Sequence, residues 1–301
     1  MNKIVNAANK NPTLRKLLDK TLEIHKDAVL PEYASPTLRQ LLKQENSTKS
    51  KIENAPHKAI LFTTCYCNYN DTEVGESLAK VLEHNKVSVE LMQKEYCCGM
   101  PKLELGDLKS VEKLKQLNIP ALYEKAQQGY ALIAAVPSCV LMFKQELPLM
   151  FPDDPQVQAV AKAFFDPFEF LFKLHKLKQL NTEFKKELGN ISYHVACHQR
   201  VQGIGPKTKK ILQLIPNTQV DSIERCSGHD GTYGVKKETL KYANKIARPI
   251  VKKILQQDPD YYGSDCPVAG SHIQHNLNKE HLDKQQKAIH PLALLCLAYQ
   301  I

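Results

Sequence analysis

Two adjacent cysteines, Cys97 and Cys98, are the residues of this chain that point most directly to chemistry. Neighbouring Cα atoms lie only about 3.8 Å apart, short of the separation usual in a disulfide, so these two thiols do not readily bond to each other. Gly99 lets the backbone approach a ligand closely, and Pro101 stiffens the chain after the pair. The pattern predicts a loop around a metal centre, and an iron–sulfur cluster fits this description.

Two further cysteines complete a first set of four, because each follows an expected strand. In open α/β sheets, sites form beyond the carboxyl ends of parallel strands, so we expect the four thiols to converge. Four thiolates close a coordination site for a soft metal. The strands, with the cysteines that follow them, are 60–64 with Cys65, 88–92 with Cys97 and Cys98, and 131–136 with Cys139.

The second half of the chain repeats this plan. Cys197, Cys226 and Cys266 follow strands expected at 191–196, 220–223 and 261–265. Corresponding cysteines of the two halves are 132, 129 and 127 residues apart. This near-constant interval indicates an internal duplication, and it is too long for a solenoid repeat, so we expect two homologous domains that face each other.

The second set has only three thiols, because Ser227 stands where the first half has its second adjacent cysteine. The open position has several candidate occupants: another side chain, a substrate, or nothing if this half binds no cluster. Metal binding is therefore expected more strongly in the first half. The candidate additional ligands are Ser227, His198, His229, Asp230 and Asp265.

Zinc is the alternative to iron at such sites. Zinc sites usually combine two close CxxC knuckles, whereas the cysteines of the first set are separated by intervals of 32 and 41 residues, which favours a cluster. Cys67 has no counterpart in the second half, since Gln199 stands two places after Cys197, and it is either a fifth ligand or a spare thiol. His194 and Cys296 are interpreted as core residues.

The elements that position these cysteines alternate between short apolar runs and helical patterns, which predicts an α/β fold of mostly parallel sheets. A helix capped by Thr13 is expected to run to about His25 with an apolar stripe, and another follows residues 35–36. The stripe comprises Leu14, Leu17, Leu18 and Leu22. The expected parts are a helical extension with a polar linker at 45–51 (1–57), a first cysteine-rich domain (58–150), a connecting segment (151–189) and a second cysteine-rich domain (190–301).

Composition narrows the class of protein. The 301 residues include 43% hydrophobic residues and nine cysteines, with a net charge of +9. No apolar run approaches the roughly 20 residues that span a bilayer, and the start lacks a secretory signal, so we expect a cytoplasmic protein with reduced or metal-bound thiols. The lysines form no basic block with interleaved aromatic residues, which argues against nucleic acid and favours a solvated surface or docking to an acidic partner or membrane face.

At these residues the sequence resembles the cysteine-rich CCG-domain family, which is related to heterodisulfide reductase. Within it, the sequence is most similar to the iron–sulfur subunits of anaerobic glycerol-3-phosphate dehydrogenase and glycolate oxidase. The resemblance implies one iron–sulfur centre per domain, which we expect to be of the [4Fe–4S] type. It also implies an electron relay between a flavoprotein dehydrogenase for glycerol-3-phosphate, glycolate or lactate and a quinone or disulfide acceptor. The matching segments are 64–70, 94–101, 137–139, 194–198, 226–238, 264–266 and 290–292.

Two departures from this family pattern bear on function. Such proteins usually begin with a ferredoxin-like segment, but no CxxCxxCxxxCP run precedes Cys65. We expect a separate ferredoxin-like carrier or subunit to supply electrons, the alternatives being that the chain is a fragment or has lost electron transfer. Neither half ends in CxxC, since Cys139 and Cys266 are followed by other residues. We expect an accessory subunit, on the inner face of the plasma membrane if it associates with a membrane. A metal-stabilised structural or assembly subunit, with zinc or no metal, is the alternative.

Overall fold

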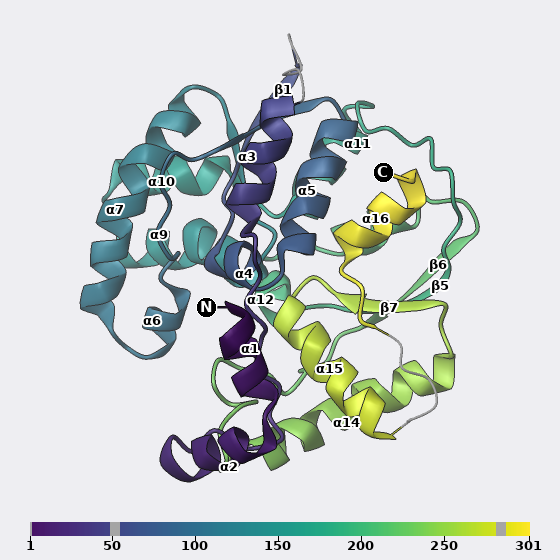
Figure 1. Ribbon diagram of the computed structural model, residues 1–301. Helices are drawn as coiled ribbons and strands as arrows, with labels where there is room; N and C mark the ends of the chain where they lie inside the picture. Colours follow the sequence, from purple (N-terminus) through teal and green to yellow (C-terminus); the bar gives the residue numbers. More distant parts are fainter. Residues whose placement is uncertain (1, 49–54, 281–286) are drawn as a thin grey trace.

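The computed structural model describes residues 2–48, 55–280 and 287–301 and shows an α/β protein with two separate parallel sheets (Figure 1). The first sheet has four strands and the second has three. The predicted fold class, two duplicated parallel α/β units, is confirmed. The strands are β1 (His57–Leu61), β2 (Val87–Leu91), β3 (Ala131–Ile133), β4 (Phe164–Phe165), β5 (Gly189–His194), β6 (Thr218–Ile223) and β7 (Tyr261–Ser264).

The two sheets have the same strand order. In the first sheet β1 lies between β2 and β3, and in the second β5 lies between β6 and β7, all paired in parallel. In both halves, therefore, the first strand of the unit is central and its two successors flank it. This arrangement brings the carboxyl ends of three successive strands to one edge of each sheet, where a site can form.

Central strands are buried because both faces of a parallel sheet are covered by helices. Residues 59–61 of β1 are buried, as are most residues of β5. The first unit carries the helices α4 (Cys65–Tyr69), α5 (Thr72–His84), α6 (Met100–Glu104), α7 (Leu108–Gln127), α8 (Pro137–Leu141), the π-helix η1 (Met142–Glu146), α9 (Leu147–Met150), α10 (Pro155–Ala163) and α11 (Pro167–Lys176).

The second unit has fewer helices. The helix expected from residue 236 begins at Leu240 instead, because residues 230–239 form turns. No described helix of the chain is long and apolar enough to cross a bilayer. The second unit carries α12 (Cys197–Arg200), α13 (Lys207–Leu212), α14 (Leu240–Gln257), α15 (Pro267–Glu280) and α16 (Pro291–Tyr299).

Two elements tie the units together. The strand β4, which was not predicted, lies in the connecting segment and pairs with β3, so this segment extends the first sheet. The C-terminal helix α16 packs against α5 of the first unit (Figure 1), and the buried Cys296 belongs to that core, as predicted. The larger hydrophobic core therefore spans both ends of the duplicated region.

The N-terminal extension folds as α1 (Asn2–Lys10), α2 (Pro12–Thr21) and α3 (Leu38–Thr48). Asn11, not Thr13, caps α2, with its Oδ1 accepting from the backbone N–H of Thr13 at 2.9 Å. Helix α3 continues into the expected linker as far as Thr48, and residues 49–51 of that linker lie outside the described residues.

The predicted apolar stripe of α2 was wrong, since Leu17 is 54% exposed and Leu14 and Leu22 are also exposed. Arg15 is the residue that α2 buries. Its guanidinium donates to the carbonyl oxygens of Lys26, at 2.9 Å, and of His25 and Ala28. Three accepting carbonyls replace the water that a buried guanidinium loses, which explains why a charged residue takes this position.

Candidate metal centre

The first cysteine set begins on a sharply bent backbone at the end of β1. Thr64 has φ +57° and ψ 157°, a conformation that β-branched residues rarely adopt. Its side-chain oxygen accepts from the backbone N–H of Cys67 at 3.1 Å, which caps helix α4 directly at Cys65. This bend lifts Cys65 out of the strand direction. Gly99, at φ +101°, makes the corresponding turn after the adjacent pair and starts α6.

The four thiols of this set interact as a connected chain of neighbours. Cys97 is hydrogen-bonded to Cys65 and to Cys98, and both interactions lower the pKa of the Cys97 thiol. The same bond to Cys97 raises the pKa of Cys65, and a bond to Cys139 is the main cause that raises the pKa of Cys98. The arrangement therefore favours a thiolate at Cys97 beside protonated neighbours, and it brings Cys65, Cys97, Cys98 and Cys139 together.

A buried ion pair supports the loop that leads to Cys97. The carboxylate of Glu95 accepts from the backbone N–H of Thr63 at 3.0 Å and pairs with Arg39 Nη1 at 3.2 Å. Arg39 Nη2 also donates to the carbonyl oxygens of Met92 and Gln93. Burial raises the pKa of Glu95, opposed by the hydrogen bonds from Thr63 and the charge of Arg39. Helix α3 of the extension thus holds the end of β1 and the cysteine loop in register.

The second cysteine set is looser. Cys197 starts α12 and is exposed, Cys226 is exposed in the loop after β6, and Cys266 lies half-buried just before α15. Burial raises the pKa of Cys197 and raises that of Cys266 to about 11. The charge of Cys226 contributes to the raised pKa of Cys197, and the charge of Cys197 contributes to the raised pKa of Cys266. No thiol–thiol hydrogen bond like those of the first set is found among these three in the described chain.

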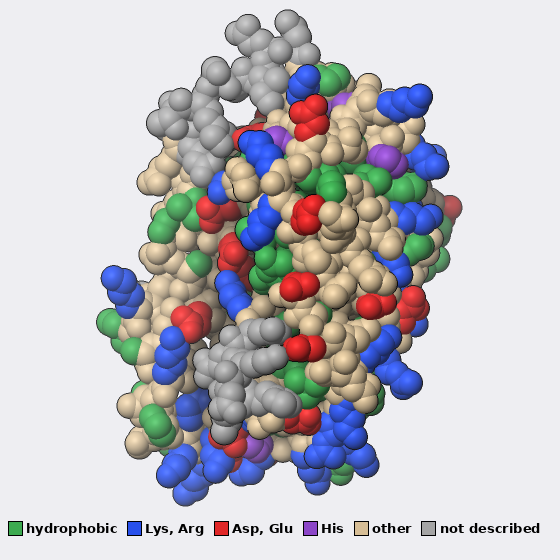
Figure 2. Space-filling view, turned by 90° about the vertical axis from the view of Figure 1, so that its right-hand side faces the viewer, with side chains coloured by type: hydrophobic (Ala, Val, Ile, Leu, Met, Phe, Trp, Pro, Cys, Tyr) green, Lys and Arg blue, Asp and Glu red, His purple; other side chains and the backbone are tan. Residues whose placement is uncertain are grey.

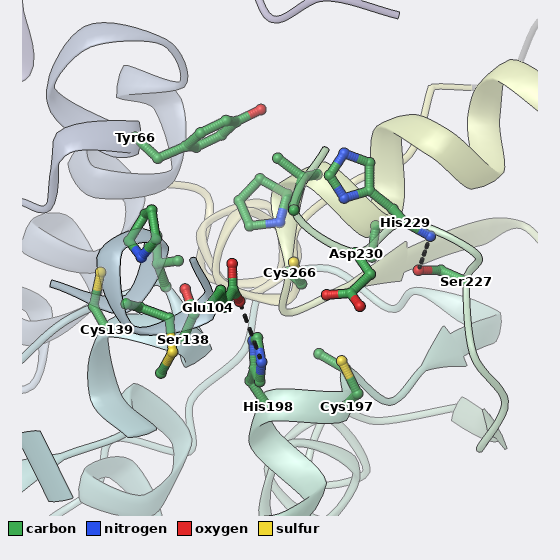
Figure 3. A pocket seen from close by; sticks show the side chains of 18 of the residues that line it. Tyr66, Glu104, Ser138, Cys139, Cys197, His198, Ser227, His229, Asp230 and Cys266 are labelled. Carbon is green, nitrogen blue, oxygen red and sulfur yellow. Dashed lines mark hydrogen bonds and ion pairs between the residues drawn. The ribbon is translucent and has the colours of Figure 1, made fainter. Parts of the chain in front are cut away.

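Ser227 is buried at the position of the missing cysteine. Its Oγ accepts from the backbone N–H of His229 at 3.4 Å (Figure 3). Gly228, at φ +79°, lies so close to α14 that an added Cβ would stand 2.1 Å from the carbonyl oxygen of Ala243. Only glycine allows this approach, so the turn presses the serine and its neighbours against the helix.

One cavity of about 260 Å³ connects the two sets. Figure 3 shows Cys139 and Glu104 on the side of the first unit and Cys197 and Ser227 on the side of the second. Most of the lining surface is apolar. The cysteines that line it are Cys65, Cys98 and Cys139 from the first unit and Cys197 and Cys266 from the second.

The candidate additional ligands divide between the cavity and the core. His198, Ser227, His229 and Asp230 line the cavity. Asp265 does not, and its buried carboxylate accepts a hydrogen bond from the hydroxyl of Tyr193. The structure therefore does not bring Asp265 to the place that the sequence analysis considered for it.

Residues outside the cysteine sets also meet at this cavity, and one of them was missed by the sequence analysis. Glu104 lies 4.0 Å from His198 across the space between the units, and burial raises the pKa of its carboxyl. Glu104 lies on the short helix that follows the adjacent cysteines, and this position was the only signal in the sequence that could have indicated it.

A buried polar network behind the second set was missed as well. The hydroxyl of Tyr193 lies 2.7 Å from Gln199 Oε1, and Gln199 Nε2 donates to Thr208 at 3.1 Å and to Asp166 at 3.4 Å. Burial raises the pKa of Asp265 to about 8 and that of Asp166 to about 6. Asp166 comes from the connecting segment, so no local sequence pattern could have linked it to the second unit.

The donor set of the first unit fits a thiolate-bound metal group, since four soft ligands lie near one another and three of them line an apolar cavity. The second set offers three thiols and a hydroxyl. In residues 2–48, 55–280 and 287–301, no group of three or more His, Cys, Asp or Glu is arranged to hold a single metal ion. The ligand assignments to individual cysteines stay predictions.

Two further expectations from the sequence concern His194 and Cys67. His194 is a satisfied core histidine, as predicted, with its ring nitrogens 2.9 Å from Ser264 Oγ and from the carbonyl oxygen of Arg225. Cys67 is buried in the core and does not line the cavity, and burial raises its pKa. This placement favours the spare thiol over the fifth ligand.

The chain is similar to several proteins of known sequence. It is 27% identical over 300 residues to a subunit of the anaerobic glycerol-3-phosphate dehydrogenase of Escherichia coli, an alignment covering 98% of this chain and 72% of the relative. It is 27% identical to a subunit of the fumarate reductase (CoM/CoB) of Methanothermobacter marburgensis, covering 82% of this chain and 47% of the relative. It is 26% identical to lactate utilization protein A of Bacillus cytotoxicus, covering 69% of this chain and 87% of the relative.

A family model agrees with the internal duplication. The cysteine-rich domain model named CCG matches the chain twice, over residues 59–144 and 191–274, which together make up more than half of its length. Each match contains one parallel unit and the cysteines at its strand ends. The chain therefore belongs to the CCG cysteine-rich domain family.

Proposed function

We propose that this protein is an iron–sulfur electron-transfer subunit of a dehydrogenase or reductase complex. The observation that carries the proposal is the gathering of four thiols at the strand ends of the first unit, three of which face thiols of the second unit across one apolar cavity. Thiolates are the ligands of iron–sulfur clusters. Two relatives are named as subunits of a dehydrogenase and a reductase, and a third as an iron–sulfur protein, which supports this class of function.

The cysteines of the first unit would hold a cluster, which we propose to be of the [4Fe–4S] type, and the second unit would hold another. Bound there, such a group accepts and releases single electrons. The chain's own residues keep Cys97 in the thiolate form and hold its loop through Glu95 and Arg39. The cavity lining is mostly apolar, and the polarity of the surroundings of such a group influences its reduction potential.

The partners belong to the same proposal. A flavoprotein dehydrogenase of the glycerol-3-phosphate, glycolate or lactate type would carry out the substrate chemistry. A ferredoxin-like carrier or subunit would exchange electrons with this chain, and a quinone or a disulfide would be the acceptor. The relatives' names, which include glycerol-3-phosphate dehydrogenase and lactate utilization, support this choice of partners. The complex would work in the cytoplasm, at the inner face of the plasma membrane if the acceptor is a quinone.

Anaerobic purification followed by iron and acid-labile sulfide analysis tests the cofactor. We expect a brown protein that contains iron and sulfide and gives an electron paramagnetic resonance signal in one oxidation state. A colourless protein that contains zinc or no metal after anaerobic reconstitution would contradict the proposal and favour a structural or assembly subunit. Affinity purification from the native host then tests the partner, and we expect a flavin-containing protein in the complex.

A further inference from the structure

Helix α14 has a strongly basic outer face. Its buried residues recur at helical spacing and cover the second sheet, whereas its exposed side carries five Lys or Arg residues. The helix contains no Asp or Glu. Residues three or four positions apart are neighbours on a helix surface, so four of these cations form one continuous stripe. They are Lys241, Lys245, Arg248 and Lys252. The fifth, Lys253, lies on the adjacent side of the helix, where its Nζ donates to the carbonyl oxygen of Ser222 at 3.4 Å.

Two partly exposed apolar side chains lie beside this stripe. Tyr242 is 49% exposed, with Lys241 Nζ 4.7 Å from the centre of its ring, and Ile246 is 40% exposed. In the described part of the chain none of the five cations forms an ion pair. Figure 2 shows Lys and Arg side chains gathered along the lower edge of the molecule, the end at which Figure 1 places α14. The face therefore presents unneutralised positive charge around a small apolar centre.

The opposite side of α14 adjoins the second cysteine set. The loop of Cys226 and Ser227 turns at Gly228, which packs against the backbone of Ala243 one residue after Tyr242. An α-helix with its side chains is about 10–12 Å across. A protein seated on the outer face would thus lie about one helix diameter from the loop that carries Cys226.

We propose that the outer face of α14 is the docking surface for an acidic one-electron carrier protein. This inference rests on the proposed electron-transfer function and deepens it by naming the surface. Charge complementarity identifies the partner as acidic, since opposite potentials steer two proteins together and fix their orientation. A carrier bound at this place would lie close to the second cysteine set, with which it would exchange electrons. The small apolar centre suits a protein contact with a polar rim.

An anionic membrane is the competing occupant, because α2 nearby exposes Leu14, Leu17 and Leu22. Membrane-bound amphipathic helices insert an apolar face, however, and the outer face of α14 offers only Tyr242 and Ile246 for insertion. The carrier protein is therefore the better match, and vesicle binding becomes an outcome of the test.

The experiment compares a double charge reversal on α14, Lys245→Glu with Arg248→Glu, with a matched reversal on an exposed helix of the first unit, Lys109→Glu with Lys113→Glu on α7. The probe is a small acidic bacterial ferredoxin with two [4Fe–4S] clusters, and its dissociation constant is measured by isothermal titration calorimetry at two salt concentrations. We expect the α14 variant to bind about 10-fold or more weakly at low salt, and added salt to weaken the wild-type complex. The α7 variant should retain wild-type affinity.

Unchanged affinity of the α14 variant, or a larger loss in the α7 variant, would overturn the proposal. So would an α14 variant that loses flotation with phosphatidylglycerol vesicles while it keeps its affinity for ferredoxin. Circular dichroism checks that both variants are folded. Iron and sulfide content and reduction by dithionite are measured in parallel, because they report on the proposed function. A wild-type protein without a reducible cluster that still binds ferredoxin through α14 would refute the function and leave the docking surface intact.

Discussion

The two cysteine-rich units share a strand order but differ in how their thiols are supported. In the first unit, neighbouring thiols shift one another's pKa values in a chain that runs from Cys65 through to Cys139. In the second, a serine replaces one thiol, and a buried network of oxygen and nitrogen groups around Asp265 lies behind the strand ends. Duplicated topology thus preserves the place of a site, whereas the side chains around that place set its chemistry.

The difference extends to what holds each cysteine loop. Arg39 and Glu95 anchor the first loop to helix α3. The second loop is held by backbone hydrogen bonds and by one side-chain ion pair. The N–H of His25 donates to the carbonyl oxygen of Val235 at 2.9 Å, and the N–H of Lys237 donates to that of Glu23 at 2.7 Å. The ion pair joins Lys237 to Asp19 at 2.7 Å. The first loop is therefore anchored through side chains, whereas the second is held by backbone pairing together with an ion pair.

Replacement of Cys98 by Ala should produce the largest effect. Cys98 is buried between Cys97 and Cys139, so its loss breaks the chain of thiols at its centre. We expect the iron bound by the first unit to be lost, which corresponds to about half of the total if both units are occupied. Iron and sulfide analysis after anaerobic purification measures this loss.

The matched control is Ser227→Ala, which changes the equivalent position of the second unit. Under the proposed assignment this variant retains the iron of the first unit. Retention of full iron content by Cys98→Ala would show that the ligand assignment is wrong. Equal losses in both variants would remove the distinction between the two units.

Ser227→Cys is expected to have a smaller effect of the opposite sign. Ser227 is buried beside the cavity, and the added sulfur would give the second unit the adjacent pair that the first unit has. Four thiolates hold a cluster more completely than three. We expect higher iron retention in the second unit on exposure to air, followed by absorbance in the visible range. Faster loss of iron than in the wild-type protein would indicate that the serine is itself required.

The sequence predicted the parts of the fold that depend on local apolar patterns. The strands leading to the cysteines were located because short apolar runs preceded Cys65, Cys97 and Cys197. The duplication followed from residue intervals alone, and the shared strand order agrees with it. The α2 prediction failed because leucines at helical spacing suggested a core-facing stripe. In an extension that packs on one side only, Arg15 took the buried position.

The parts of the site that the sequence did not predict depend on long-range contacts. Arg39 and Glu95 are 56 residues apart in the chain, and nothing near either residue indicates the other. Asp265 stands next to Cys266 and was therefore considered as a ligand, but the hydroxyl of Tyr193 holds its carboxylate in the core. Nearness to a cysteine in the sequence identified candidate metal ligands. Whether such a residue is a ligand or supports the cysteine loops depends on how separate elements pack together.

The smallest predicted effect concerns Asp166. It tests whether burial in the network of the second unit destabilises the ionised form of this carboxyl. Burial raises the pKa of its carboxyl to about 6, although the backbone N–H groups of Phe168 and Glu169 donate to it. In the unfolded chain an aspartate titrates near pH 3.9. Between about pH 4 and pH 6 the folded state therefore binds more protons, so this group's contribution to stability falls as pH rises.

Asp166→Asn removes this titration and keeps a good helix cap. Relative to the variant, the wild-type protein should lose on the order of 1 kcal/mol of unfolding free energy between about pH 5 and about pH 7. Urea unfolding followed by circular dichroism measures this difference. Asp154→Asn is the control, because Lys115 lowers the pKa of that helix-capping carboxyl and its contribution is lost as pH falls. Parallel pH profiles for wild type and Asp166→Asn would show that the network does not raise the pKa of this carboxyl.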